Sequence, residues 1–561
     1  MIYKLFCGHP LIQEHRMFVV RNILKRSSGK IYHSILLRKS YRENGKVKKK
    51  TIANLSNCSE SEISLIETCL KKKTKEIIDN DFRLLQGKSF GAVYILHQFA
   101  KRLGIVQALG SSFHANLALW LIIARILEQG SRLSAARLDK HYDIASIIGL
   151  ERGFDENNLY DCLRWLSENQ KKIENNLFHQ KQHSTKFYWY DVTSSYLEGE
   201  HNELAAFGYN RDKKKRKRII VVGLLCEQNG NPISIEAFKG NTQDTQTIES
   251  QILKLKHRFE CQSIAVVGDR GLIRNKQKIL LEKHGLHYIS ALTLPEVLSL
   301  INNGHVNLHD FTQDLRSFSQ DGVRYIYRCN AERALETQRQ RQERFETAQR
   351  KVDQENQRLR EKHKVSAMIA KKRIKKVLKK LCVYEWVSVN VVKRQLVLKI
   401  EEGKLKEKEK MDGCYIWTTD LSEKETSDRE VYERYKDLKY VEDDFRTLKT
   451  TFLEIRPIYV RTEESTRGHI LVSMLAHMIV RELRSAWVKF DKTVHEALSE
   501  LSFLCRNYIL FPNGKKVSCI PEANESMAAL LHAAQITLPN HHEEIIVPVV
   551  TRRKVRKSAN I

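Results

Sequence analysis

The sequence predicts a multi-domain protein with an α/β core, preceded by a small β module and a helical bundle and interrupted by a large α+β insertion. Three observations carry this prediction: apolar residues at even spacing near the start, helical spacing over residues 89–185, and a series of apolar strands from Lys186 onward. The chain has 561 residues, 42% of them hydrophobic, and only 8 Pro, which is enough apolar material for several folded units.

The domain organisation follows from these changes in pattern. Phe18 and Val20 begin a strand-rich stretch, and the spacing becomes helical over 61–78. We expect six segments: a small basic β-hairpin module with a helix (1–80), a helical domain for DNA binding or dimerisation (81–185), the first part of the core (186–291), the insertion (292–425), the second part of the core (426–505) and a basic C-terminal tail (506–561).

The core strands are the most apolar part of the chain. Apolar strands with interposed helices indicate an α/β sheet that is buried on both faces. An aromatic run at 187–190 leads to Asp191, further apolar runs follow at 219–226, 232–238, 263–267 and 287–291, and a helix is expected over 276–284.

Residues 292–425 interrupt this pattern. A long polar helix is predicted over 331–362, where Phe345, Val352 and Leu359 recur every seven residues, which supports a helical arm or a coiled-coil contact. A basic amphipathic helix (367–381) and three strands (385–392, 395–400 and 414–418) follow, and then a helix over 424–449 that carries Glu442.

The charge balance favours a polyanionic partner. Lys and Arg number 96 against 67 Asp and Glu, a net charge of +29, and the excess gathers at 211–218, 371–380 and 552–557. Such clusters attract nucleic acid through counterion release, although a cationic surface kept for solubility has the same composition. Because the chain lacks a long apolar stretch, a signal-peptide pattern and any C-x-x-C pair among its 11 cysteines, we expect no membrane insertion, disulfide framework or zinc site.

Three acidic residues are candidates for metal-dependent chemistry. Asp191 and Asp269 each follow an apolar strand, and a carboxylate at the carboxyl edge of a buried sheet is held rigidly and still reaches solvent. Oxygen ligands of this kind suit Mg²⁺. Glu442 supplies a third acid, on a helix face that it shares with Tyr435, Arg446 and Lys449. Taken singly, each aspartate is more readily explained as a turn residue, and the helix as an exposed charged one.

The segment around Glu442 resembles the Tyr-x2-Arg-x3-Glu-x6-Lys motif of bacterial DDE insertion-sequence transposases. Tyr435, Glu442 and Lys449 occupy three of its positions, while Leu438 stands where the motif has arginine. Arg434 and Arg446 are candidates to compensate. The resemblance runs from about residue 17 to 505, and the segments that carry it elsewhere are 191–193, 207–212, 238–244, 267–271, 456–459 and 468–470.

The resemblance implies a ribonuclease H-like catalytic core with the insertion between the second aspartate and the glutamate. It also implies two Mg²⁺ ions, replaceable by Mn²⁺, held by Asp191, Asp269 and Glu442. The implied partner is double-stranded DNA, both element ends and target, bound by a homodimer or higher multimer in the bacterial cytoplasm and nucleoid. The residues expected to contact DNA are Tyr435, Arg446, Lys449, Arg270, Arg211, Lys214, Arg216 and Arg218.

The expected function is that of a DNA transposase. Metal-dependent cleavage at inverted-repeat ends frees a 3′-OH, which then attacks target DNA in a strand-transfer step. Two alternatives stay open. One is a catalytically inactive, sequence-specific DNA-binding protein or repressor derived from a transposase, which the departure at Leu438 favours. The other is a related nuclease or resolvase without strand transfer.

Overall fold

The chain consists of two compact units, Met1–Lys88 with Leu504–Glu522 and Leu538–Ile561, and Ser89–Phe503 with Ala523–Thr537. The computed structural model describes residues 17–25, 31–43, 46–71, 82–180, 186–212, 214, 216–362, 364–449, 453, 455, 456, 458–511, 516–539 and 542–545.

The smaller unit contains two antiparallel sheets. β1 (Met17–Lys25), β2 (Ile31–Glu43) and β3 (Lys46–Asn54) form one, against which α1 (Glu60–Lys71) packs. The other has the order β17 (His542–Ile545), β16 (Lys516–Cys519), β15 (Cys505–Leu510) and β4 (Arg83–Ser89).

The C-terminal region therefore differs from the expected basic tail, since it supplies three of these strands and the helix α19 (Glu525–Ala533). The reason is non-local pairing: the backbone N–H of Gly87 donates to Oδ1 of Asn507 at 3.1 Å, across 420 residues of chain. The basic cluster at 552–557 lies outside the described residues.

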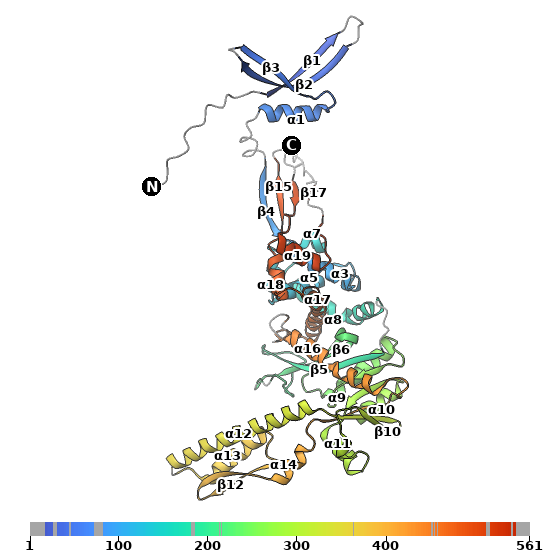
Figure 1. Cartoon of the computed structure of the whole chain (residues 1–561), viewed down its shortest axis with the longest axis vertical. Helices are drawn as coiled ribbons and strands as arrows, with labels where there is room; N and C mark the ends of the chain where they lie inside the picture. Colours follow the sequence, from blue (N-terminus) through green and yellow to red (C-terminus); the bar gives the residue numbers. More distant parts are fainter. Residues whose placement is uncertain are drawn as a thin grey trace, which may run out of the picture. The chain divides into compact units, whose positions relative to one another are not determined.

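The larger unit is built on an eight-stranded mixed sheet (Figure 1). β5 pairs antiparallel with β6 and parallel with β8, and β8 pairs parallel with β9. In sheet order the strands are β10 (Arg316–Gln320), β11 (Val323–Cys329), β14 (Cys414–Thr419), β9 (His287–Ala291), β8 (Ala265–Val267), β5 (Phe187–Tyr196), β6 (Ile219–Glu227) and β7 (Asn231–Lys239).

Residues 292–425 are thus not separate from the core sheet. Three strands of this segment extend the sheet, and β14 pairs directly with β9, for example Trp417 with Ala291. β10 and β11 were not expected from the sequence, because their sequences, RSFSQ and VRYIYRC, contain polar residues and lack a continuous apolar run.

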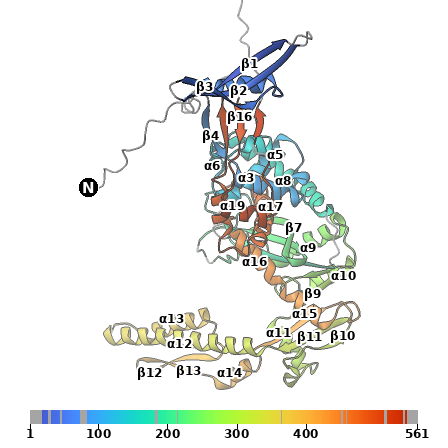
Figure 2. The same ribbon diagram turned by 45° about the horizontal axis from the view of Figure 1, so that its top comes forward.

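The rest of the insertion forms an arm with its own apolar core. α12 (Ala331–Glu361), α13 (Ala367–Lys380), β12 (Val387–Val392) and β13 (Gln395–Ile400) lie side by side in Figures 1 and 2, with α14 (Glu402–Glu409) after them. Val352 and Leu359 are buried in this core, and Phe345 packs on it. The seven-residue stripe therefore packs within the arm, on residues such as Ile374 of α13.

Helices cover both faces of the sheet. Tyr188, Tyr190 and Val192 point to one face, where they join a core with α9 (Asp244–Leu253) and α10 (Asn275–Lys283). Since strand side chains alternate, Trp189 and Asp191 point to the other face. There α15 (Asp428–Lys436) and α16 (Leu438–Lys449) pack, and the indole N–H of Trp189 donates to the Arg434 carbonyl oxygen at 2.8 Å.

The helical bundle is built around a helix from the far end of the core. α17 (Glu463–Ala486) packs against α8 (Glu156–His179), α5 (Phe113–Leu127) and α3 (Gly91–Arg102), and most of its side chains are buried. Gly468 permits the closest approach, because a Cβ there would overlap the carbonyl of Leu163. The helical region is therefore continuous with the core rather than a module of its own.

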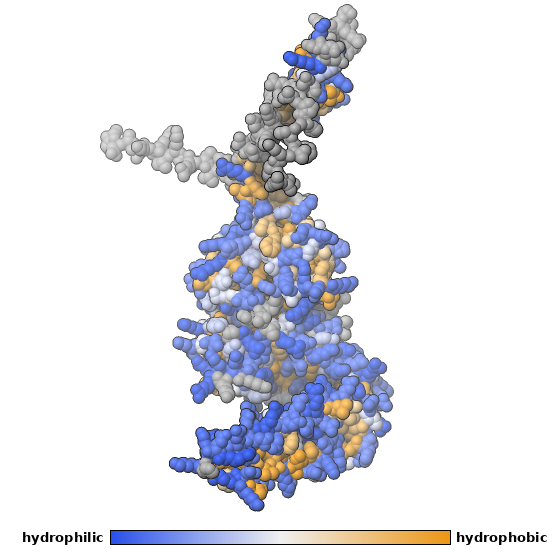
Figure 3. Space-filling model, turned by 60° about the vertical axis from the view of Figure 1, so that its left-hand side comes forward, coloured by the Kyte–Doolittle hydropathy of each residue, from blue (hydrophilic) through white to orange (hydrophobic). Residues whose placement is uncertain are grey.

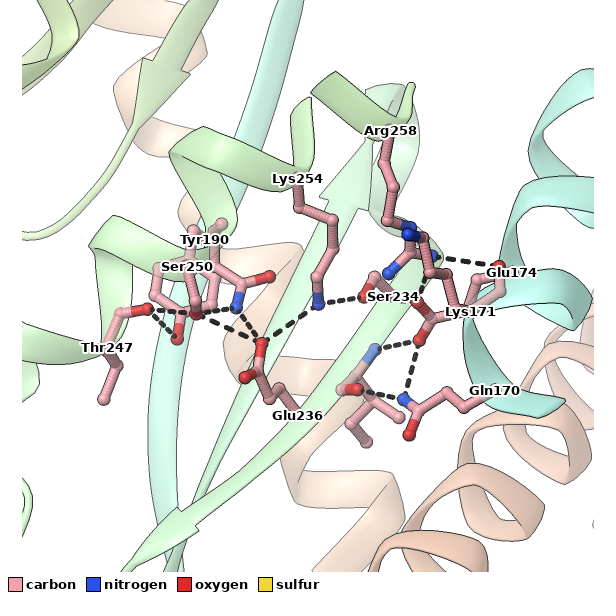
Figure 4. Close-up of polar contacts among 12 residues, drawn as sticks. Gln170, Lys171, Glu174, Tyr190, Ser234, Glu236, Thr247, Ser250, Lys254 and Arg258 are labelled. Carbon is pink, nitrogen blue, oxygen red and sulfur yellow. Dashed lines mark hydrogen bonds and ion pairs between the residues drawn. The ribbon is translucent and has the colours of Figure 1, made fainter. Parts of the chain in front are cut away.

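A polar network fastens α8 to the sheet (Figure 4). The fully buried Glu174 accepts hydrogen bonds from Ser234 Oγ at 3.0 Å and from Arg258 at 2.6 Å. Lys254 bridges Ser234 to Glu236, at 2.7 and 3.1 Å. Such paired and hydrogen-bonded charges tolerate burial, whereas a lone charge would not.

Hydrophilic side chains predominate on the face drawn in Figure 3, as expected with 29% charged residues. Among the described helices, none combines the length and apolar composition of a membrane span.

Candidate active site

Parallel pairing of β5 with β8 brings Asp191 and Asp269 to the same edge of the sheet. Trp189 is the register partner of Val267, and each aspartate lies two residues further along its chain. The prediction that Asp191 follows the end of its strand is wrong, because β5 continues to Tyr196 through its antiparallel pairing with β6. Asp191 instead lies in mid-strand, where the parallel ladder with β8 has ended.

Glu442 reaches the site from α16. The apolar residues Leu438, Val441, Phe445 and Leu448 are buried and form one helix face, which packs toward β5. Glu442 lies on the neighbouring face.

The expected single helix over 424–449 is two helices, α15 and α16, with Asp437 between them. Tyr435 thus belongs to a different helix from Glu442, Arg446 and Lys449. The break follows Arg434, whose carbonyl accepts from Trp189, a tertiary interaction that no helical pattern reveals.

The three acids line both of two adjoining cavities. One, of about 410 Å³, has an aromatic wall that contains Tyr415, Trp417, Tyr432 and Tyr435. The other, of about 490 Å³, is polar. Its lining residues other than the three acids include Thr193, Tyr209, Arg211, Asp244, Arg446 and Lys449. Asp191, Asp269 and Glu442 therefore form the boundary between the two cavities.

Electrostatics couple the three acids. Burial, helped by the negative charges of Asp269 and Glu442, raises the pKa of Asp191 to about 7, and the Val192 N–H and the Arg211 guanidinium oppose this rise. Oδ1 of Asp269 accepts from the Arg270 backbone N–H at 2.7 Å and from the Tyr435 hydroxyl at 3.2 Å. Burial and the Asp269 charge raise the pKa of Tyr435, so the phenol stays protonated as a donor.

The acids fit a divalent cation by donor chemistry, because they are hard oxygen ligands that gather around shared cavities. A cation would favour the ionised form of Asp191, which its surroundings disfavour. The carboxylate oxygens of the three acids do not surround one common position for an ion. In the described part of the chain, no three His, Cys, Asp or Glu side chains lie close enough together to hold a metal ion.

Lys449 lies in the second cavity but is held by an acid. Its Nζ is 3.3 Å from Oδ1 of the buried Asp212, which also pairs with Arg456. Burial lowers the pKa of Lys449, and Asp212 opposes this effect. Arg211 similarly pairs with Asp244 at 2.6 Å. The positive charges at this wall are therefore positioned by acids of the 212 and 244 loops.

The remaining expected DNA contacts divide into two groups. Arg270 and Tyr435 line the first cavity, whereas Arg446 lines the second and pairs with Asp443 at 2.7 Å. The structure does not bring the other three to either cavity: Lys214, Arg216 and Arg218.

Sequence reasoning missed Arg328 of β11. This side chain lines the first cavity together with Leu438, and its guanidinium lies 5.2 Å from the ring centre of Tyr432. Arg434, considered as a substitute for the missing arginine, lines neither cavity and pairs with Asp437 at 3.2 Å. No signal in the sequence marks Arg328, because its place depends on the pairing of β11 with β14.

A buried polar cluster under α16 was also missed. Asp444, two residues after Glu442, accepts from Nε2 of His477 at 2.8 Å and from Arg481 at 2.9 Å. Arg481 also donates to the Gly230 carbonyl oxygen at 2.6 Å. Burial lowers the pKa of His477. The cluster ties α16 to α17 and to the turn between β6 and β7, and so fixes the height of Glu442 above the sheet.

Two family models match the chain. A family model described as the transposase DDE domain matches residues 182–479, and one described as the IS1634 family transposase N-terminal domain matches residues 20–80. Curated proteins give no match. One similar solved chain is in the cryo-EM structure of the piggyBac transposase synaptic complex with hairpin DNA, with 9% sequence identity and a TM-score of 0.34 over 69% of this chain and 70% of that one.

Proposed function

The chain belongs to the transposase DDE domain family, and from this premise we propose that Asp191, Asp269 and Glu442 are its catalytic carboxylates. As a DNA transposase, the protein cleaves and joins DNA with the help of divalent metal ions. The observation that carries the assignment is that these three acids, distant in sequence, line both adjoining cavities.

The sheet supports a ribonuclease H-like core as part of this proposal. The order β7-β6-β5-β8-β9 consists of three antiparallel strands followed by two parallel ones. Asp191 lies on the central strand, Asp269 after its parallel neighbour, and Glu442 on the helix that covers them.

Asp191, Asp269 and Glu442 would hold two Mg²⁺ ions, replaceable by Mn²⁺, which would supply the positive charge that activates a nucleophile and stabilises a leaving oxygen. The other residues of the site orient the acids or neutralise the charge of DNA phosphates. Tyr435 holds Asp269 through its hydroxyl, and Arg328 offers a guanidinium to DNA phosphate where Leu438 cannot. The substrates are the ends of the element and target DNA, joined in a multimer in the bacterial cytoplasm.

Cleavage of a supercoiled plasmid that carries the element's ends tests the assignment. Asp191→Ala, Asp269→Ala and Glu442→Ala should each reduce Mg²⁺-dependent nicking to background and leave end binding in a gel-shift assay intact. Glu433→Ala is the matched control, because this acid lies on the adjacent helix α15, pairs with the exposed Arg429 and lines neither cavity. Full nicking by the Glu442→Ala protein would overturn the assignment, and binding without nicking by the wild type would indicate an inactive derivative.

A further inference from the structure

The loop before β6 displays two aromatic side chains to solvent, Phe207 and Tyr209. Phe207 is 70% exposed and Tyr209 is 79% exposed. Tyr209 lines the cavity that contains the three acids. Two exposed aromatic rings two residues apart form a small apolar surface that is available to a binding partner.

The loop that carries them is anchored at several points. The backbones of Ala206 and Ile219 exchange two hydrogen bonds, of 3.1 and 2.9 Å. Gly208 lies so close to Gly240 that a Cβ would overlap the Gly240 carbonyl. The N–H of Arg211 donates to Ser194 Oγ at 3.0 Å. The rings are therefore presented by a fixed backbone rather than by a freely moving loop.

Cationic side chains accompany the two rings along this loop. The guanidinium of Arg211 lies 5.5 Å from the ring centre of Tyr209. Lys214 and Arg216 follow in the same loop, are exposed, and pair with no acid among the described residues. Aromatic rings interleaved with cations provide stacking surfaces for bases and contacts for the adjoining phosphates, whereas an apolar protein partner would not call for this charge.

We propose that Phe207 and Tyr209 form a stacking platform for unpaired bases of the DNA strand that enters the polar cavity. The proposal rests on the proposed function, since it takes DNA as the ligand of this cavity. A base in an intact duplex is already stacked on both faces. The platform therefore favours DNA whose bases are unpaired next to the bond to be cleaved.

Fluorescence anisotropy with labelled DNA tests this proposal in EDTA, without cleavage. The probes are a random-sequence duplex with a short internal unpaired segment and the same duplex fully paired. Wild-type protein should bind the duplex with the unpaired segment more tightly. The Phe207→Ala and Tyr209→Ala variants should each bind that duplex roughly 5- to 100-fold more weakly than wild type does, with little change in their affinity for the fully paired duplex. Tyr209→Phe should keep the preference, because the ring and not the hydroxyl stacks.

Phe503→Ala is the matched control, since Phe503 is 76% exposed and lines neither cavity. An undiminished preference in the Phe207→Ala, Tyr209→Ala double variant overturns the proposal. So does a change in the sedimentation of that variant without DNA, which would assign the rings to an interface between copies of the chain. Glu442→Ala protein should retain the preference, so failure of the nicking assignment and failure of the platform are distinguishable.

Discussion

The hydroxyl of Tyr435, on α15, donates a hydrogen bond of 3.2 Å to Oδ1 of Asp269, which follows β8. Among the described residues, the other hydrogen-bond donor to this carboxylate is the backbone N–H of Arg270. The orientation of the Asp269 side chain therefore depends on a residue 166 positions further along the chain.

Tyr435→Phe should slow cleavage by about 10- to 100-fold, because a hydrogen bond to a charged group is removed while the ring is kept. End binding measured by gel shift should not change. Tyr440→Phe serves as the control, since Tyr440 lies on α16 but lines neither cavity. Equal cleavage rates for the Tyr435→Phe and wild-type proteins would show that Asp269 needs no such support.

Asp191 should make the free energy of unfolding of the metal-free protein depend on pH. Its pKa is raised from 3.8 to about 7, so between these values the folded protein holds a proton that the unfolded chain has released. Stability therefore falls as pH rises through this window, by at most about 1.4 kcal/mol per pH unit. Asp191→Asn removes the effect. Thermal melts in EDTA from pH 4 to 8 test this. The difference in melting temperature, variant minus wild type, should increase as pH rises, and a difference that is constant with pH would contradict the prediction.

The cluster under α16 should be essential for stability and for the position of Glu442. Asp444→Ala leaves His477 and Arg481 without their shared acceptor in a buried site, at a cost of about 3 kcal/mol or more. Chemical denaturation measures this cost. Asp443→Ala on the exposed side of α16 should change stability by less than about 0.5 kcal/mol. Equal unfolding free energies for the two variants would show that the cluster does not stabilise the protein.

Arg328 should contribute to cleavage through the DNA phosphates at the first cavity. Arg328→Ala should slow nicking by about 10-fold or more, and Arg328→Lys should recover part of the rate, because lysine keeps the charge but not the paired donors. The control is Arg434→Lys, which lies beside the helix break and faces neither cavity. A wild-type nicking rate for Arg328→Ala would show that Arg328 does not replace the arginine that the motif has at the position of Leu438.

The basic face of α13 should supply sequence-independent affinity. Lys375, Lys376 and Lys379 are exposed. Changing all three to Gln should weaken binding to any duplex alike. It should also make the slope of log K against log salt concentration shallower by about 0.9 for each DNA phosphate that is no longer neutralised. Lys408→Gln is the control, because Lys408 pairs with Glu385. A weaker binding that is confined to one DNA sequence would contradict this role.

The local pattern of apolar residues was sufficient to predict many of the secondary-structure elements. The strands at 219–227, 231–239 and 287–291 were predicted close to their observed bounds, since continuous apolar runs mark strands that are buried on both faces. Asp191 and Asp269 could be singled out because each comes near the end of such a run, and Glu442 because its motif has fixed spacing.

Tertiary structure alone decided how these residues meet. The register of β5 with β8 sets the two aspartates side by side, the break at Asp437 separates Tyr435 from the helix of Glu442, and the strands of the insertion bring Arg328 to the first cavity. The sequence by itself determined which side chains are candidates for the chemistry, because apolar periodicity and motif spacing are local. It could not determine their neighbours, because strand register and burial depend on pairings between segments far apart in the chain.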